Sequence, residues 1–111
     1  MADTAPEKSL VEELVAGGMK KDLAMTCQAL LTKIGQRKRR AAYIEEIIGD
    51  MATLHEFKKD MLAYIRFHGE VNSGLRLMMM YGYICFVRTT GEYAITQEGY
   101  ARVEKFLPKV R

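Results

Sequence analysis

The sequence predicts a mostly helical α/β fold with one β-hairpin near its C-terminal end. Two runs of apolar, β-branched and aromatic residues, 83–87 and 93–95, flank a short polar tip at residues 89–92. Within that tip Gly91 can adopt a positive φ angle without steric penalty, as tight turns require. Elsewhere apolar residues recur at helical spacing, so the rest of the chain is expected to form helices around this hairpin.

Residues beside the hairpin predict where the neighbouring helices end and begin. Gly82 is expected to end a helix over residues 75–81, because a C′ residue without a Cβ can turn the chain in the left-handed conformation. Thr96 is expected to cap the last helix, since its hydroxyl can accept a hydrogen bond from the first turn. The predicted order is therefore helix, strand, turn, strand, helix.

Length and composition are those of one globular domain. The chain has 111 residues, of which 49% are apolar and 28% charged. Its longest apolar run is five residues, far shorter than a membrane span. The acidic N-terminus is not followed by the apolar segment of a signal peptide. We therefore expect a cytoplasmic protein with no membrane partner.

Charge and cysteine content limit the classes of function. Residues 36–111 contain thirteen Lys or Arg and nine acidic residues, a modest excess that suits a polyanionic partner. Cys27 and Cys85 are expected to be buried free thiols, since no Cys or His lies near either at metal-ligand spacing. No catalytic triad or phosphate-binding loop is present, and the adjacent Glu45 and Glu46 would face different directions on a helix. We expect neither an enzyme nor a cofactor or metal site.

Two N-terminal helices are predicted ahead of residue 36. Ser9 and Glu12 fit a capping box that begins the first helix, and the glycines at 17 and 18 end it. The second helix is expected over residues 20–34, with one apolar face formed by Leu23, Cys27, Leu30, Leu31 and Ile34. Residues 1–36 are interpreted as a helical extension used in packing or dimerisation, and residues 37–111 as the principal domain.

The middle of the chain is divided into three further helices. The first follows the basic run 37–40 and is expected to end at Gly49. Thr53 and Glu56 fit a capping box that begins a helix through residue 66. A turn at residues 67–69 is then expected to separate it from a helix over residues 70–81.

These elements resemble the winged helix-turn-helix superfamily. The residues that carry the resemblance are Tyr81-Gly82-Tyr83-Ile84, Thr90-Gly91 and Tyr93-Ala94-Ile95-Thr96-Gln97-Glu98-Gly99. The last run is similar to the Y-x-L-T-x-x-G ending of MarR-like and PadR-like regulators. The resemblance implies a winged helix-turn-helix domain whose wing is the hairpin, with a short strand at residues 51–53 that joins the hairpin in a three-stranded sheet. It also implies a transcriptional regulator that binds double-stranded DNA.

The resemblance also implies a set of DNA-binding residues. If Val71, Leu75 and Met78 pack inward, the helix over residues 70–81, which is the third helix of the winged domain, presents its polar side chains to the major groove, where Asn reads adenine and Arg reads guanine. The wing and the helix before it, which ends at residue 66, would contact the DNA backbone. The predicted DNA-binding residues are Asn72, Ser73, Arg76, Arg88, Thr89, Thr90, Lys58, Lys59, Arg39 and Arg40.

Two interpretations of the basic run 37–40 are left open. It could be a solvated helix start, or it could meet a phosphate backbone, which would offset the cost of positive charge at the N-terminal end of a helix.

Apolar residues in the helix over residues 70–81 and in the hairpin suggest a protein partner as an alternative to DNA. Residues 77–80 are all apolar and cannot all face one small core, so Leu77, Met79 and Met80 are candidates for a protein contact. Both faces of strand 83–87 are apolar, and cover is expected from the N-terminal helices of the same chain or of a second subunit. Many regulators of the winged-helix superfamily dimerise through helices outside the winged core, so the resemblance implies a homodimer. The alternative function is a winged-helix interaction module that binds DNA weakly or not at all.

Overall fold

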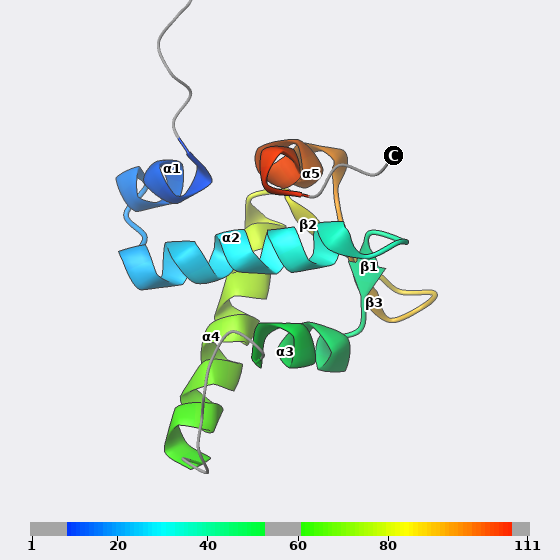
Figure 1. The fold of residues 1–111 in the computed structure, drawn as a ribbon, viewed down its shortest axis with the longest axis horizontal. Helices are drawn as coiled ribbons and strands as arrows, with labels where there is room; N and C mark the ends of the chain where they lie inside the picture. Colours follow the sequence, from blue (N-terminus) through cyan, green and yellow to red (C-terminus); the bar gives the residue numbers. More distant parts are fainter. Residues whose placement is uncertain (1–8, 53–60, 108–111) are drawn as a thin grey trace, which may run out of the picture.

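The computed structural model describes residues 9–52 and 61–107 (Figure 1). Within these residues the fold is mostly helical and includes one small antiparallel sheet. No helix in the described part is long and apolar enough to cross a membrane. The elements in chain order are α1 Leu10–Ala16, α2 Lys21–Gln36, β1 Ala41–Ala42, α3 Ile44–Ala52, α4 Met61–Met80, β2 Ile84–Val87, β3 Glu92–Ile95, α5 Gln97–Val103 and the 3₁₀ helix η1 Glu104–Phe106.

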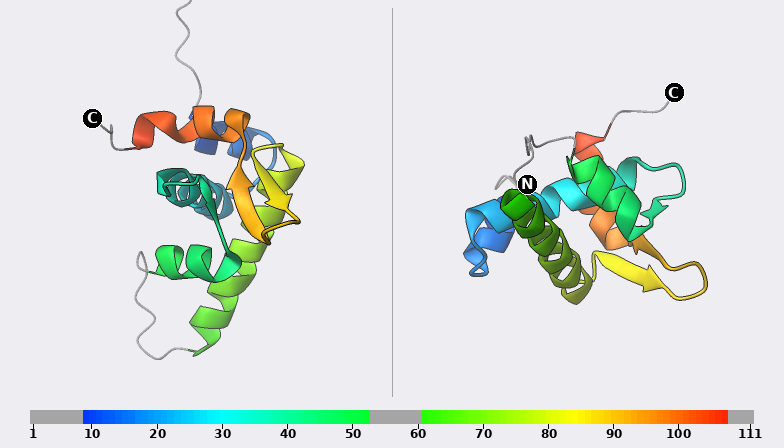
Figure 2. Two further views of the ribbon diagram at one scale, coloured as in Figure 1. Left: turned by 90° about the vertical axis from the view of Figure 1, so that its right-hand side faces the viewer. Right: turned by 90° about the horizontal axis from the view of Figure 1, so that it is seen from below.

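Helix α2 lies at the centre of the fold. It packs between α5 on one side and α3 and α4 on the other, and it also contacts α1 (Figures 1 and 2). The predicted apolar face of this helix is confirmed: Leu23 is half-buried and the others are fully buried, namely Cys27, Leu30, Leu31 and Ile34. Because the chain itself covers this face, α2 shares one hydrophobic core with the elements after residue 37.

The sheet has the strand order β1-β3-β2, with antiparallel neighbours. The predicted hairpin is confirmed, and Val87 pairs with Glu92 across a loop of residues 88–91. Gly91 has a φ of +78°, and its N–H donates to the Val87 carbonyl at 2.7 Å. Thr89 and Thr90 are exposed as predicted, whereas Glu92 is buried and begins β3.

The predicted helix boundaries beside the hairpin are confirmed. Gly82 has a φ of +81°, and the amides of Gly82 and Tyr83 donate to the carbonyls of Met79 and Met78, at 3.1 and 2.8 Å. This pair of bonds is the Schellman arrangement that ends a helix. Thr96 caps α5, since its Oγ1 accepts from the Gly99 amide at 3.0 Å. The capping box of Ser9 and Glu12 is also present.

The strand predicted at residues 51–53 is wrong. Met51 and Ala52 are the last residues of α3, which continues through Gly49, and the short strand is instead β1. An exposed glycine weakens a helix by only about 1 kcal/mol. Met51 is 2% exposed, so its burial outweighs that cost. The capping box predicted for Thr53 and Glu56 lies outside the described residues.

The turn predicted at residues 67–69 is also wrong, because α4 runs without interruption through it. Phe67 and Val71 are buried one helical turn apart, and the buried stripe continues through Leu75 and Met78. Helix geometry is needed to place these four side chains on one face. Gly69 lies on the exposed side of the helix, where it has no packing to disturb.

Within the single chain the hairpin is covered only in part. Ile84 is buried, but Cys85 and Phe86 are exposed, so the chain's own N-terminal helices do not cover both faces of β2, and cover by a second subunit stays a prediction. Phe86 instead packs against its cross-strand partner Tyr93, with ring centroids 5.1 Å apart. Of the two predicted buried thiols only Cys27 is buried, and burial raises its pKa to about 11.

Candidate nucleic-acid interface

The exposed face of α4 carries three of the predicted DNA-binding residues. Asn72, Ser73 and Arg76 are exposed, as expected from the inward packing of the buried stripe on the same helix. The opposite face is held close to α2, because a Cβ at Gly74 would lie 2.6 Å from Leu30 Cδ1. Gly74 and Arg76 are two residues apart, a rotation of about 200° around the helix. Arg76 therefore points away from α2 and out of the fold.

Asn72 makes one hydrogen bond within its own helix. Its Nδ2 donates to the His68 carbonyl at 3.0 Å. The Oδ1 atom has no protein partner in the described part of the chain, so it is available as an acceptor. Bidentate reading of adenine uses both groups of the amide. Asn72 would therefore have to release its bond to His68 on binding.

The same face of α4 also exposes large apolar side chains. Met80 is 81% exposed and Met79 is 40% exposed, whereas Leu77 is half-buried against the core. At the other end of α4, which projects past α3 in Figure 1, the exposed apolar residues are Met61, Leu62 and Ile65. Arg76 thus lies within a mixed surface, with apolar residues toward both ends of the helix.

The hairpin tip places Arg88, Thr89 and Thr90 beyond the helices (Figures 1 and 2). Arg88 is exposed and has no carboxylate partner among residues 9–52 and 61–107, so its charge is available to an anion. The Thr90 Oγ1 accepts from the Glu92 amide at 3.3 Å and helps to shape the turn. Strand β2, which leads to the tip, follows α4 in the chain and contacts it.

The basic run 37–40 is not a helix start, contrary to the first interpretation. It forms the turn between α2 and β1, where the Arg37 amide donates to the Ile34 carbonyl and the Arg40 amide to the Arg37 carbonyl. Positive charge is favourable there, because the C-terminal end of a helix carries partial negative charge. The electrostatic cost that would have favoured a bound phosphate is therefore absent.

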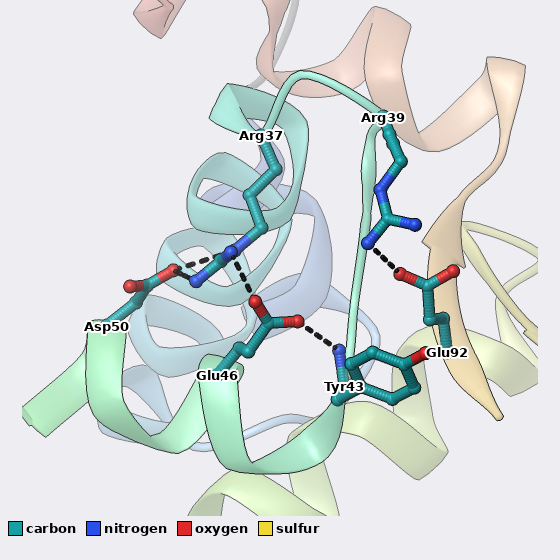
Figure 3. A network of polar contacts seen from close by, with 6 residues as sticks. All are labelled: Arg37, Arg39, Tyr43, Glu46, Asp50 and Glu92. Carbon is teal, nitrogen blue, oxygen red and sulfur yellow. Dashed lines mark hydrogen bonds and ion pairs between the residues drawn. The ribbon is translucent and has the colours of Figure 1, made fainter. Parts of the chain in front are cut away.

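Arginines of this turn are paired within the chain (Figure 3). Arg37 bonds both Glu46 and Asp50 of α3, each at 2.8 Å. Arg39 pairs with Glu92 at 2.7 Å, and the Arg40 guanidinium lies 3.7 Å from the centroid of the Tyr100 ring. Sequence reasoning missed these partners. The four-residue spacing of Glu46 and Asp50, which places two carboxylates on one helix face, was a usable signal.

Glu46 gives this network a testable dependence on pH. Its Oε1 accepts from the Tyr43 amide at 2.9 Å, and this bond, together with the charges of Arg37 and Arg39, lowers the pKa of the Glu46 carboxyl below 4.5. A lowered folded-state pKa stabilises the fold above the unfolded value, and the stabilisation is lost as the pH falls through the folded value.

We therefore expect Glu46→Gln to lower the thermal midpoint near neutral pH and to match the wild type at an acidic pH below the folded-state pKa, where the carboxyl is protonated in both states. The adjacent, exposed Glu45 makes no hydrogen bond or ion pair within the described residues, so Glu45→Gln is the matched control and should change neither midpoint. A deficit of Glu46→Gln that is equally large at both pH values would contradict this assignment.

The remaining predictions concern Lys58, Lys59 and metal binding. Both lysines lie outside the described residues. Among the residues that are described, no group of three or more His, Cys, Asp or Glu side chains could hold a metal ion.

A scan of protein-family models, a search of curated proteins and a search of solved structures each gave no match to this chain.

Proposed function

We propose that this chain is a winged-helix protein that binds double-stranded DNA and regulates transcription. The single observation that carries the proposal is that Asn72 and Arg76 on α4, and Arg88 at the tip of the hairpin that contacts α4, are all exposed. The element order also supports it: α2, β1, α3, α4, β2 and β3, with the strand order β1-β3-β2, correspond to helix, strand, two helices and wing. In this assignment α2, rather than the helix predicted after residue 40, is the first helix of the winged domain.

The residues have separate roles in this proposal. Arg76 donates to a guanine edge in the major groove, and Asn72 contacts a neighbouring base after its bond to His68 is released. Arg88 neutralises a phosphate beside the wing, with Thr89 and Thr90 next to it. Arg37, Arg39 and Arg40 have partners within the chain, so we do not assign them as the main phosphate contacts.

Duplex titrations at two salt concentrations test the proposal. Arg76→Ala should weaken binding by about 1–3 kcal/mol and relax the preference at one base position. Arg88→Ala should weaken binding to all duplexes alike and reduce the salt slope by about one unit. The matched control is Lys20→Ala, which removes an exposed cation at the start of α2 and should change neither affinity nor slope.

The duplexes should include random sequence and fragments selected from genomic DNA. The same titration curve for wild type, Arg76→Ala, Arg88→Ala and Lys20→Ala would show that α4 and the hairpin tip do not bind DNA as proposed.

A second candidate function rests on the exposed apolar residues of α4. An exposed methionine such as Met80 is more typical of an adaptable protein contact than of a base-reading surface. A protein partner, or a second copy in the predicted homodimer, would cover it. Met80→Glu should then abolish the protein complex or halve the mass in solution, while Arg76→Ala leaves both unchanged. A monomeric wild type whose duplex affinity depends on Arg76 would exclude this alternative.

A further inference from the structure

Glu92 is the one charged residue that is buried within residues 9–52 and 61–107. Only 5% of its surface is exposed, and it is the first residue of β3, directly after the tip loop 88–91. Its Oε2 lies 2.7 Å from Nη2 of Arg39. Burying a carboxylate is costly unless a cation compensates it. The position of Glu92, and with it the end of β3 that carries the tip loop, therefore depends on Arg39.

Arg39 reaches Glu92 from a turn that is itself anchored. The Arg40 amide donates to the Arg37 carbonyl at 2.9 Å, and the Ile95 amide donates to the Arg40 carbonyl at 3.0 Å. Arg37 is bonded to two carboxylates of α3. As Figure 3 shows, the Arg39 side chain extends from this turn along β3 toward Glu92. The ion pair thus connects the wing to a rigid part of the fold.

The tip of the wing has few other polar restraints. In the described part of the chain, residues 88–91 make hydrogen bonds only within the hairpin, from the amides of Thr90 and Gly91 to the Val87 carbonyl and from the Glu92 amide to Thr90. A loop held mainly by its own bonds can shift relative to the strands that carry it. The contact of Glu92 with Arg39 lies where the loop joins β3 and opposes that motion.

We infer that Arg39 is a positioning residue that fixes the wing through Glu92, and that it does not itself contact a phosphate. This inference rests on the proposed function for its consequence: a fixed wing sets where Arg88 meets the DNA backbone. It assigns Arg39 and Arg88 different roles, although both are exposed arginines beside the hairpin.

Amide hydrogen exchange at Gly91 and duplex titrations test the inference together. Arg39→Ala should speed exchange at Gly91 and weaken duplex binding, each by about tenfold, with an unchanged salt slope. In a Glu92→Gln background, Arg39→Ala should have little further effect on Gly91 exchange or on duplex affinity. Arg39→Lys, which keeps the positive charge, should retain most of the slow exchange and most of the affinity. Arg40→Ala is the matched control, since Arg40 stacks on Tyr100 and should leave Gly91 exchange unchanged.

Two results would overturn the inference. Unchanged Gly91 exchange in Arg39→Ala would show that the ion pair does not hold the wing. The second result is an Arg39→Ala variant whose salt slope falls by about one unit and whose duplex affinity falls equally in the wild-type and Glu92→Gln backgrounds. That result would identify Arg39 as a direct phosphate contact. If the wild type binds no duplex, the proposed function fails, while the exchange measurement still decides whether Arg39 positions the wing.

Discussion

Gly99→Ala is expected to destabilise the fold by about 3 kcal/mol or more, a large part of the roughly 5–15 kcal/mol by which small domains are stable. A Cβ at Gly99 would lie 2.2 Å from the carbonyl oxygen of Tyr83 and 2.9 Å from its carbonyl carbon. Both are backbone atoms, so no side-chain rotation relieves the clash. The same oxygen accepts from the Thr96 amide at 3.0 Å, which holds the start of α5 against the chain that leads into β2. Any shift must therefore disrupt that junction.

Urea unfolding of Gly99→Ala beside Gly49→Ala measures this effect. Gly49 is an exposed residue of α3 with open space where a Cβ would be, so its substitution should be neutral or stabilise the fold by up to about 1 kcal/mol. Equal unfolding midpoints for Gly99→Ala and the wild type would show that α5 does not pack as closely as described.

Leu30→Ala should have the second large effect, a loss of about 2–5 kcal/mol. Leu30 is fully buried at the contact of α2 with α4, where its Cδ1 occupies the space above Gly74. Removing its side chain leaves a cavity between the two central helices. The control on the same helix is Met25→Ala, because Met25 is 53% exposed, and its substitution should change stability by less than about 0.5 kcal/mol.

Thermal unfolding of the two variants tests whether α2 is integral to the fold. A chain without residues 1–34 should likewise lose cooperative unfolding, because it lacks most of α2. If Leu30→Ala and Met25→Ala unfold at the same temperature, α2 would instead be a detachable extension of the kind that the sequence suggested.

The features that the sequence predicts correctly are governed by local chemistry. Gly82 and Gly91 adopt positive φ angles that other residues disfavour, and Ser9 and Thr96 bond amides within three residues of themselves. The exposure of Asn72 and Arg76 follows from helical periodicity once the buried stripe of α4 is identified. Such features require no knowledge of distant parts of the chain.

The features that the sequence does not predict depend on packing between distant segments. Gly49 and Gly69 read as breaks in a helix, but burial of Met51, Phe67 and Val71 against the core outweighs their low helix propensity. The roles of the basic run are also non-local, because Arg39 finds its partner only after β3 is placed beside the turn. Neither periodicity nor spacing identifies Glu92 as that partner.

We propose that the exposed face of α4 and the wing bind one duplex together. Amide chemical-shift mapping during titration with a selected duplex tests this proposal. The largest shifts should fall on residues 72–76 and 88–91 at the same duplex concentration, with little change in α1. Shifts confined to the exposed apolar residues near Met61 and Ile65, or none at a saturating duplex concentration, would contradict it.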